Sequence, residues 1–170
     1  MKVKKLRVFD FDDTLVKTNS FIYITNGEIT KKISPGEYAI YEEKPGDIFD
    51  YSDFEDVKNP KQIKEMTMVF KRIANKRNGK GLFILTARAA YKPVRKYLKD
   101  IGINMENIFV KALGSNDPNE KANWIKNKIE NENYNDIYFA DDSEKNIITV
   151  KNMLLKQKNI KYKLQKINYD

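Results

Sequence analysis

The stretch Leu6-Arg7-Val8-Phe9-Asp10-Phe11-Asp12-Asp13-Thr14-Leu15 joins an apolar run to a cluster of three aspartates. Residues 6–11 have the composition of a buried strand, and the acidic cluster marks the place where that strand ends. In an extended chain, side chains two positions apart point the same way, so Asp10 and Asp12 are expected on one side and Asp13 on the other. This stretch therefore predicts a strand that brings a pair of carboxylates to its carboxyl end.

From residue 60 onward, apolar runs alternate with segments of helical periodicity. The runs at 82–85, 108–110 and 137–140 are typical of buried parallel strands, and a final strand is predicted at 160–167. Helices are predicted around them at about 63–78, 93–101, 118–129 and 144–157, with Gly79 and Gly102 ending the first two. This alternation predicts the α/β class, with a three-layer α/β/α Rossmann-like arrangement around a mostly parallel sheet.

Residues 16–58 break the alternation. Segments 21–24 and 37–41 look like short strands, and the turn signals Asn26-Gly27 and Ser34-Pro35-Gly36 separate them. We therefore predict a small β-hairpin and loop at 16–58, inserted after the first strand of one domain that spans residues 1–170. An insertion of this size is expected to leave the edge of the sheet nearly open.

The composition excludes several kinds of chemistry. The 170-residue chain contains neither His nor Cys, so it has no Ser-His-Asp triad, no thiolate nucleophile, no Cys/His zinc site and no iron–sulfur cluster. An enzyme of this composition has to use carboxylates, Lys, Arg, Tyr and hydroxyl groups. A cation that prefers oxygen ligands fits such a set.

The net charge of +8 is unevenly distributed. Residues 1–60 hold 9 Lys/Arg and 12 Asp/Glu, whereas residues 61–170 hold 23 and 12. The basic part favours an anionic partner such as a nucleic acid or a phosphorylated molecule, and a merely solvated Lys-rich surface is an equal alternative. Without a signal sequence or an apolar run of about 20 residues, we expect no membrane association and a cytoplasmic location. The oligomeric state stays open.

Polar residues follow each of three predicted strands. They are Asp10, Asp12, Asp13 and Thr14 after the first strand, Thr86, Ala87 and Arg88 after the second, and Asp141 and Asp142 after the strand at 137–140. Because the carboxyl ends of parallel strands lie along one edge, these side chains are expected to meet there. Converging carboxylates repel one another unless a cation lies among them, and an all-oxygen ligand set favours Mg²⁺.

The segment Asp10-Phe11-Asp12-Asp13-Thr14-Leu15 resembles the first motif of the haloacid dehalogenase-like (HAD) phosphohydrolases, Asp-x-Asp-x-Thr/Val. The other motifs follow in the family's order, with Thr86 after a strand, Lys121 opening a helix, and Asp141-Asp142 after an apolar strand. The resemblance covers residues 4–150 apart from the insertion. One departure is Asp13, where many members carry Gly.

The resemblance implies a phosphatase that works through an aspartyl-phosphate. Asp10 would be the nucleophile, Asp12 the general acid and then the general base, and Lys121 would offset negative charge. Contacts to the phosphorylated substrate would come from Thr86, Ala87 and Arg88, with Asp13 and Thr14 beside them. Mg²⁺ would be bound by Asp10, the backbone carbonyl of Asp12, Asp141 and Asp142.

An open, basic protein favours the phosphorylated end of a polynucleotide as the substrate, and residues 120–142 are similar to the 3′-phosphatase domain of phage-type polynucleotide kinases. A nucleotidase or small-molecule phosphatase is an alternative, with Tyr23, Tyr38 and Tyr41 as candidates for stacking on a base. A phosphotransferase and a catalytically silent nucleic-acid-binding module also stay open. Each motif alone has a simpler explanation, since aspartates after strands often cap the next helix.

Overall fold

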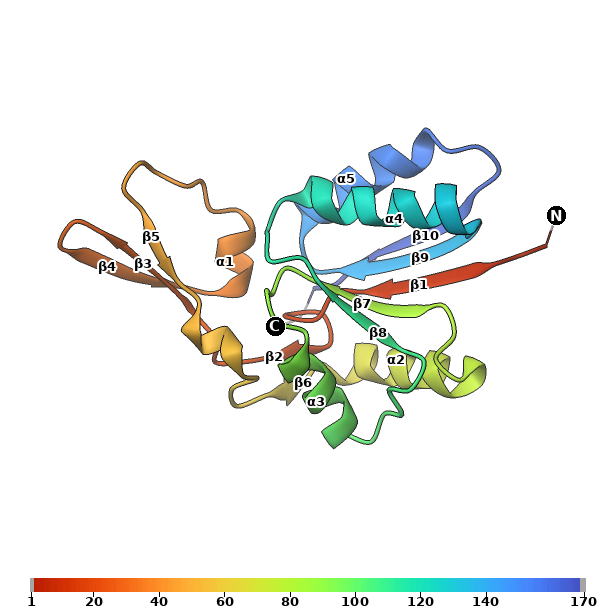
Figure 1. The fold of residues 1–170 in the computed structure, drawn as a ribbon, viewed down its shortest axis with the longest axis horizontal. Helices are drawn as coiled ribbons and strands as arrows, with labels where there is room; N and C mark the ends of the chain where they lie inside the picture. The colour runs from red at the N-terminus through yellow and green to blue at the C-terminus, as the bar shows by residue number, and fades with distance from the viewer. Residues whose placement is uncertain (1, 169–170) are drawn as a thin grey trace.

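The computed structural model describes residues 2–168. Within that range, five parallel strands form the central sheet in the order β10-β9-β1-β7-β8 (Figure 1). These strands are β1 (Lys5–Phe9), β7 (Leu82–Thr86), β8 (Phe109–Ala112), β9 (Asp136–Asp141) and β10 (Lys161–Lys166). The predicted α/β class with a parallel sheet is thus confirmed.

Helices cover both faces of the sheet, which makes three layers. They are α2 (Lys64–Arg77) and α3 (Lys92–Asp100) on one face, and α4 (Pro118–Glu132) and α5 (Glu144–Leu155) on the other (Figure 1). Successive side chains of β1 point to opposite faces of the sheet. Leu6 and Val8 pack with α4 and α5 on one face, whereas Phe9 packs with α2 on the other. Of the helices in residues 2–168, none is both long enough and apolar enough to cross a bilayer.

Local sequence signals set the helix ends that frame the sheet edge. Asp117 caps α4 by accepting a hydrogen bond from the Asn119 backbone at 2.9 Å, and Pro118 occupies the first helical position. Ser143 caps α5 in the same way through the Asn146 backbone. At the other end of the sheet, Gly81 has φ +73°, and a side chain there would collide with the Lys5 carbonyl. The caps Asp117 and Ser143 fix where α4 and α5 begin, next to the carboxyl ends of the strands.

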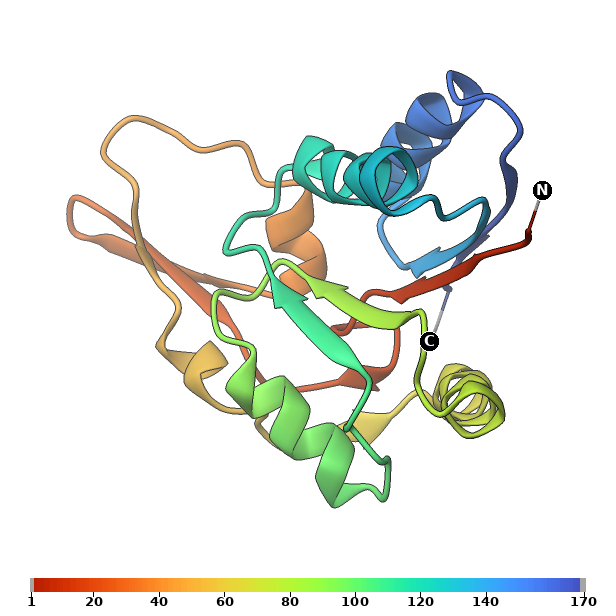
Figure 2. The same cartoon turned by 45° about the vertical axis from the view of Figure 1, so that its right-hand side comes forward.

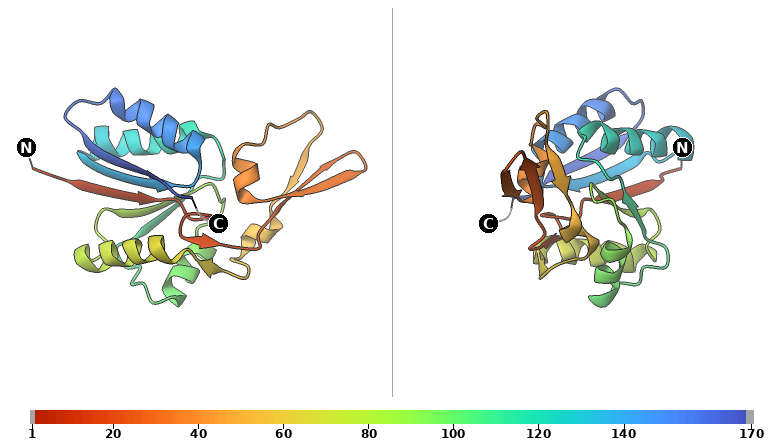
Figure 3. Two further views of the ribbon diagram at one scale, coloured as in Figure 1. Left: turned by 180° about the vertical axis from the view of Figure 1, so that it is seen from behind. Right: turned by 60° about the vertical axis from the view of Figure 1, so that its left-hand side comes forward.

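The insertion is a folded unit held on a short two-stranded stem. The stem pairs β2 (Val16–Lys17) with β6 (Lys61–Gln62) in antiparallel fashion. Within residues 18–60, all of which the structure describes, β3 (Ile22–Asn26), β4 (Ile29–Ile33) and β5 (Ile48–Asp50) form a sheet in the order β4-β3-β5. Figures 2 and 3 show this unit projecting beyond the carboxyl edge of the central sheet.

The strand predicted at 37–41 is wrong, because residues 37–39 belong to α1 (Pro35–Ala39) and residues 40–41 follow that helix outside any strand. Ser34 caps that helix by accepting from the Glu37 backbone, and the Glu37 carboxylate accepts from the Ser34 backbone in return. This reciprocal pattern, Ser-x-x-Glu with Pro at the first helical position, outweighs the β propensity of the aromatic residues that follow. The insertion also contains β5 and the 3-10 helix η1 (Ser52–Glu55), so it is more than a hairpin.

Buried side chains of α2 hold one helical layer on the sheet. Phe70 is fully buried and meets the Phe9 ring edge-to-face, with the centroids 5.2 Å apart. We expect Phe70→Ala to lower the free energy of unfolding by about 3–5 kcal/mol in a denaturant titration. Met68, on the same helix but 60% exposed, is the control, and Met68→Ala should change stability by less than about 0.5 kcal/mol. Equal losses in the two variants would contradict this packing.

Candidate active site

Three adjacent strands deliver polar residues to the carboxyl edge of the sheet. Asp10 follows β1, Thr86 ends β7 and Asp141 ends β9, and β1 lies between the other two strands. The chain winds from β1 toward β8 on one side and returns to β9 on the other, so the direction of winding reverses beside β1. Open α/β sheets bind their ligands at such a reversal. A cavity of about 560 Å³ lies at this position, between the sheet edge and the insertion.

Three carboxylates form an acidic cluster in this cavity. Asp10, Asp141 and Asp142 each offer one oxygen, and the three oxygens lie within 4.8 Å of one another. Asp10 and Asp141 are buried and Asp142 is half-buried. The cluster could hold a metal ion, and its all-oxygen composition suits a hard cation.

Crowding in the acidic cluster disfavours the charged carboxylates. Burial, together with the charge of Asp141, raises the pKa of Asp10 to about 6. Burial and the nearby charges of Asp10 and Asp141 raise the pKa of Asp142 to about 10. A bound cation would offset the free-energy cost of charging these carboxylates. The raised pKa values therefore favour a cation site, as the spacing of the oxygens does.

Lys121 supplies a buried positive charge from the first turn of α4. Its Nζ donates to Asp10 Oδ1 at 2.9 Å and to Asp141 Oδ2 at 2.8 Å, and the side chain is only 4% exposed. Burial alone would lower the pKa of Lys121, but the charges of Asp10 and Asp141 outweigh it and raise the pKa above its usual value. Lys121 therefore stays charged and ties the end of β1 to the end of β9.

Further hydrogen bonds fix the orientation of the cluster. Thr14 Oγ1 donates to Asp10 Oδ2 at 3.0 Å, so both oxygens of Asp10 are bonded. Asn146 Nδ2 donates to Asp141 Oδ2 at 3.0 Å. Asn146 is not among the predicted residues, yet a sequence signal for it exists. It lies four and eight residues before Val150 and Leu154, so it is a polar residue on the buried face of α5.

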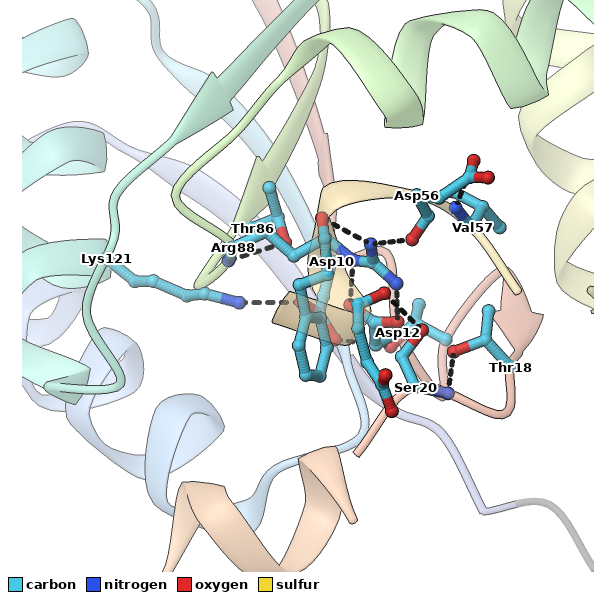
Figure 4. A network of polar contacts seen from close by, with 12 residues as sticks. Asp10, Asp12, Thr18, Ser20, Asp56, Val57, Thr86, Arg88 and Lys121 are labelled. Carbon is cyan, nitrogen blue, oxygen red and sulfur yellow. Dashed lines mark hydrogen bonds and ion pairs between the residues drawn. The ribbon is translucent and has the colours of Figure 1, made fainter. Parts of the chain in front are cut away.

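Arg88 joins the sheet edge to the insertion through Asp12. Its Nε and Nη2 donate to the two oxygens of Asp12 at 2.8 and 2.9 Å, and its Nη1 donates to the backbone carbonyls of Asp56 at 3.0 Å and Phe54 at 3.4 Å (Figure 4). The Arg88 side chain is 1% exposed, and the guanidinium lies over the Phe54 ring. These bonds orient Asp12 and hold the end of the insertion against the sheet.

The structure brings most of the predicted residues to one place. The cavity is lined by Asp10, Asp12, Asp13, Thr86, Ala87, Arg88, Lys121, Asp141 and Asp142. Asp13 borders the cavity despite the expected alternation, because its φ of +63° departs from an extended chain. Thr14 is not among the described residues that line the cavity, and its hydroxyl donates to Asp10 instead. The Asp12 carboxylate is paired with Arg88 and lies outside the acidic cluster, and metal binding by the Asp12 carbonyl stays a prediction.

The insertion forms the opposite wall of the cavity, so the expectation of a nearly open site needs revision. Tyr38, Phe49, Tyr51 and Phe54 line this wall, and of these only Tyr38 was predicted. Asn116 Nδ2 donates to the Tyr38 carbonyl at 2.8 Å and holds α1 near the loop before α4. Tyr23 and Tyr41 are not among the described residues of the lining.

Comparison of the chain with protein-family models, with curated proteins and with solved structures finds no match. Any assignment of function therefore depends on the residues and geometry of the site.

The contact between Asp12 and Arg88 can be measured by a double-mutant cycle. Because both groups are largely buried, Arg88→Met and Asp12→Asn should each lower the free energy of unfolding by about 3–5 kcal/mol. The double variant should lose less than the sum, with a coupling energy of about 1–3 kcal/mol. The exposed pair Lys96–Asp100 is the control, with an expected coupling below about 0.5 kcal/mol. Additive losses at Asp12 and Arg88 would contradict the direct contact.

Proposed function

We propose that the chain is a Mg²⁺-dependent phosphomonoester hydrolase of the haloacid dehalogenase-like type, acting through an aspartyl-phosphate. The observation that carries this proposal is the placement of Asp10, which belongs to the acidic cluster and also bonds to buried Lys121. With a pKa of about 6, the Asp10 carboxylate is mainly ionised at neutral pH and needs no separate base to act as a nucleophile. The absence of His and Cys from the chain agrees with carboxylate chemistry.

The reaction proceeds in two displacements at phosphorus. First, an Asp10 oxygen forms a bond to phosphorus while the bond to the leaving oxygen breaks, and Asp12 gives that oxygen a proton. Then Asp12 takes a proton from water, the water oxygen bonds to phosphorus, and the bond to Asp10 breaks to release phosphate. Asp12 thus has to enter the first displacement protonated, as the acid, and becomes the base once it has lost that proton. The two hydrogen bonds that Asp12 accepts from Arg88 orient this charged form.

The remaining residues neutralise and hold the phosphoryl group. Asp10, Asp141 and Asp142 would bind Mg²⁺, with the Asp12 carbonyl as a further ligand. When bound, Mg²⁺ offsets the charge of the phosphoryl oxygens, which is the main demand of phosphoryl transfer. Lys121 adds a fixed positive charge beside Asp10, and the buried Thr86 hydroxyl lies in the cavity wall for contact with a phosphoryl oxygen.

A silent nucleic-acid-binding module is less compatible with these features. Binding a polyanion gains nothing from three crowded carboxylates, and the raised pKa values of Asp10 and Asp142 show that charge on these two groups is costly. The free-energy cost of charging these groups is explained if the cluster binds a cation and takes part in a chemical step. The acidic cluster therefore favours an enzyme.

Removal of the nucleophile is the direct test of the reaction. We expect Asp10→Asn to reduce Mg²⁺-dependent hydrolysis of an aryl phosphate at least about a thousandfold while the circular dichroism spectrum stays unchanged. Asp100→Asn, an exposed aspartate on α3, is the matched control and should retain wild-type activity.

Wild-type turnover by Asp10→Asn would refute the aspartyl-phosphate. Trapping of a covalent phosphate on Asp10 in the wild-type protein, seen by mass spectrometry after acid quenching, would support it.

Metal binding can be tested by thermal unfolding. Saturating Mg²⁺, at about 100 times its Kd, should raise Tm by about 5–10 °C relative to EDTA. Asp142→Asn should fold normally, because a carboxyl group with a pKa of about 10 is neutral in the metal-free protein and an amide of the same shape replaces it, but its Mg²⁺-induced shift should be much smaller. Asp100→Asn should keep the full shift. Equal shifts in Asp142→Asn and the wild type would exclude Asp142 as a ligand.

A further inference from the structure

The wall that the insertion contributes to the cavity is aromatic. Tyr38, Phe49, Tyr51 and Phe54 all line the cavity, opposite the acidic cluster. The rings of Phe49 and Tyr51 are stacked at 10° with centroids 5.9 Å apart, and Tyr38 meets both of them edge-to-face. Phe54 lies against the Arg88 guanidinium, which in turn holds Asp12. Aromatic side chains of the insertion therefore line the cavity as far as Arg88, the residue that holds Asp12.

The Tyr51 ring is accessible within this wall. Tyr51 is 43% exposed although its hydroxyl bonds to that of Tyr38 at 2.9 Å. A rigid ring that is already held by its neighbours loses little conformational freedom when a ligand stacks on it. The wall thus offers a preformed platform for a planar group.

The charges around the cavity disfavour additional phosphates. Among the described lining residues there are eight carboxylates but only two cations, Arg88 and Lys121. Both cations are already paired with aspartates. On the insertion side, Asp50 and Glu55 add negative charge close to the aromatic wall. Even with one divalent cation bound, the lining stays negative.

From these observations we propose that the substrate is a compact phosphomonoester with a single phosphate and an uncharged leaving group that carries a planar ring, such as a nucleoside monophosphate. This inference rests on the proposed function. The phosphate would face the acidic cluster and Lys121, and the planar group would stack on the Tyr51 side of the cavity. The cavity volume of about 560 Å³ lies within the usual range for small-molecule sites.

The same charges argue against the end of a polynucleotide. Each additional nucleotide would bring another phosphate toward the acidic rim formed by Asp50 and Glu55. The basic excess of residues 61–170 does not change this, because Arg88 and Lys121 are the only basic side chains of that part among the described residues that line the cavity. The expectation of a polynucleotide substrate depended on an open site and on the net charge of the whole chain, and the local charge of the cavity opposes it.

The first experiment compares nucleoside monophosphates with substrates that carry additional phosphates or lack a planar ring. With saturating Mg²⁺, kcat/KM is measured for 3′- and 5′-nucleoside monophosphates, the 3′,5′-bisphosphate of the same nucleoside, a 3′-phosphorylated oligonucleotide, and glycerol phosphate, which lacks a ring. We expect one of the monophosphates to exceed each of the other three classes by about tenfold or more. Equal or faster turnover of the oligonucleotide or the bisphosphate would overturn the proposal.

The second experiment changes the wall and its charge. Tyr51→Ala should lower kcat/KM for the monophosphate by about 5- to 100-fold through KM, and should affect glycerol phosphate far less. Tyr51→Phe is the matched control, because it keeps the ring and loses only the hydroxyl contact to Tyr38. Glu55→Lys should raise turnover of the bisphosphate relative to the monophosphate. Equal losses on all substrates in Tyr51→Ala would refute stacking.

Binding separates this inference from the proposed function. In the Asp10→Asn protein, calorimetry should show tighter binding of the monophosphate than of the oligonucleotide, and weaker binding after the additional change Tyr51→Ala. If no phosphate ester is hydrolysed but this selectivity is found, the hydrolase proposal fails and the ligand class stands. If hydrolysis occurs but the oligonucleotide binds better, the ligand class fails and the hydrolase stands.

Discussion

The repulsion among carboxylates at the end of β1 is the constraint on which the site depends. The order of the sheet makes this crowding unavoidable, because β9 is hydrogen-bonded along β1 and brings Asp141 next to Asp10. The fold compensates with one buried lysine that reaches both aspartates, and with Thr14 and Asn146 as neutral donors. The starting point of α4, and with it the position of Lys121, therefore matters as much as the aspartates themselves.

The central domain could be predicted from sequence because its signals are local. Buried parallel strands such as β7 are continuous apolar runs. Asp10, Thr86 and Asp141 stand at the carboxyl ends of such runs in the sequence, so their positions at the sheet edge could be predicted. The insertion was predicted less well, because its short, aromatic segments carry helix and strand signals at once. The contact of Arg88 with Asp12 and the Asp56 carbonyl joins residues 76 and 32 positions apart. No periodicity indicates such contacts, since they arise only when the insertion is packed against the sheet.

The electrostatics of this molecule differ between the whole chain and the cavity. The chain has a net charge of +8, yet the described residues that line the cavity at the carboxyl edge of the sheet are mostly acidic among those that carry charge. Net charge acts over the surface and influences long-range encounter, whereas a buried site responds to the few groups within several ångströms. A basic chain can therefore hold an acidic site, and the sign of the total charge is a poor guide to the ligand.

The insertion has its own apolar cluster around Ile22, Ile24 and Ile33, which shares no residue with the two clusters of the central domain. Its link to Asp12 uses the main-chain carbonyls of Phe54 and Asp56, which any amino acid would provide. Apart from Phe54, whose ring lies over the Arg88 guanidinium, side chains in this unit can consequently be exchanged without disturbing the orientation of Asp12. In evolution or in engineering, this separation makes the aromatic wall of the cavity a replaceable module above a constant acidic cluster.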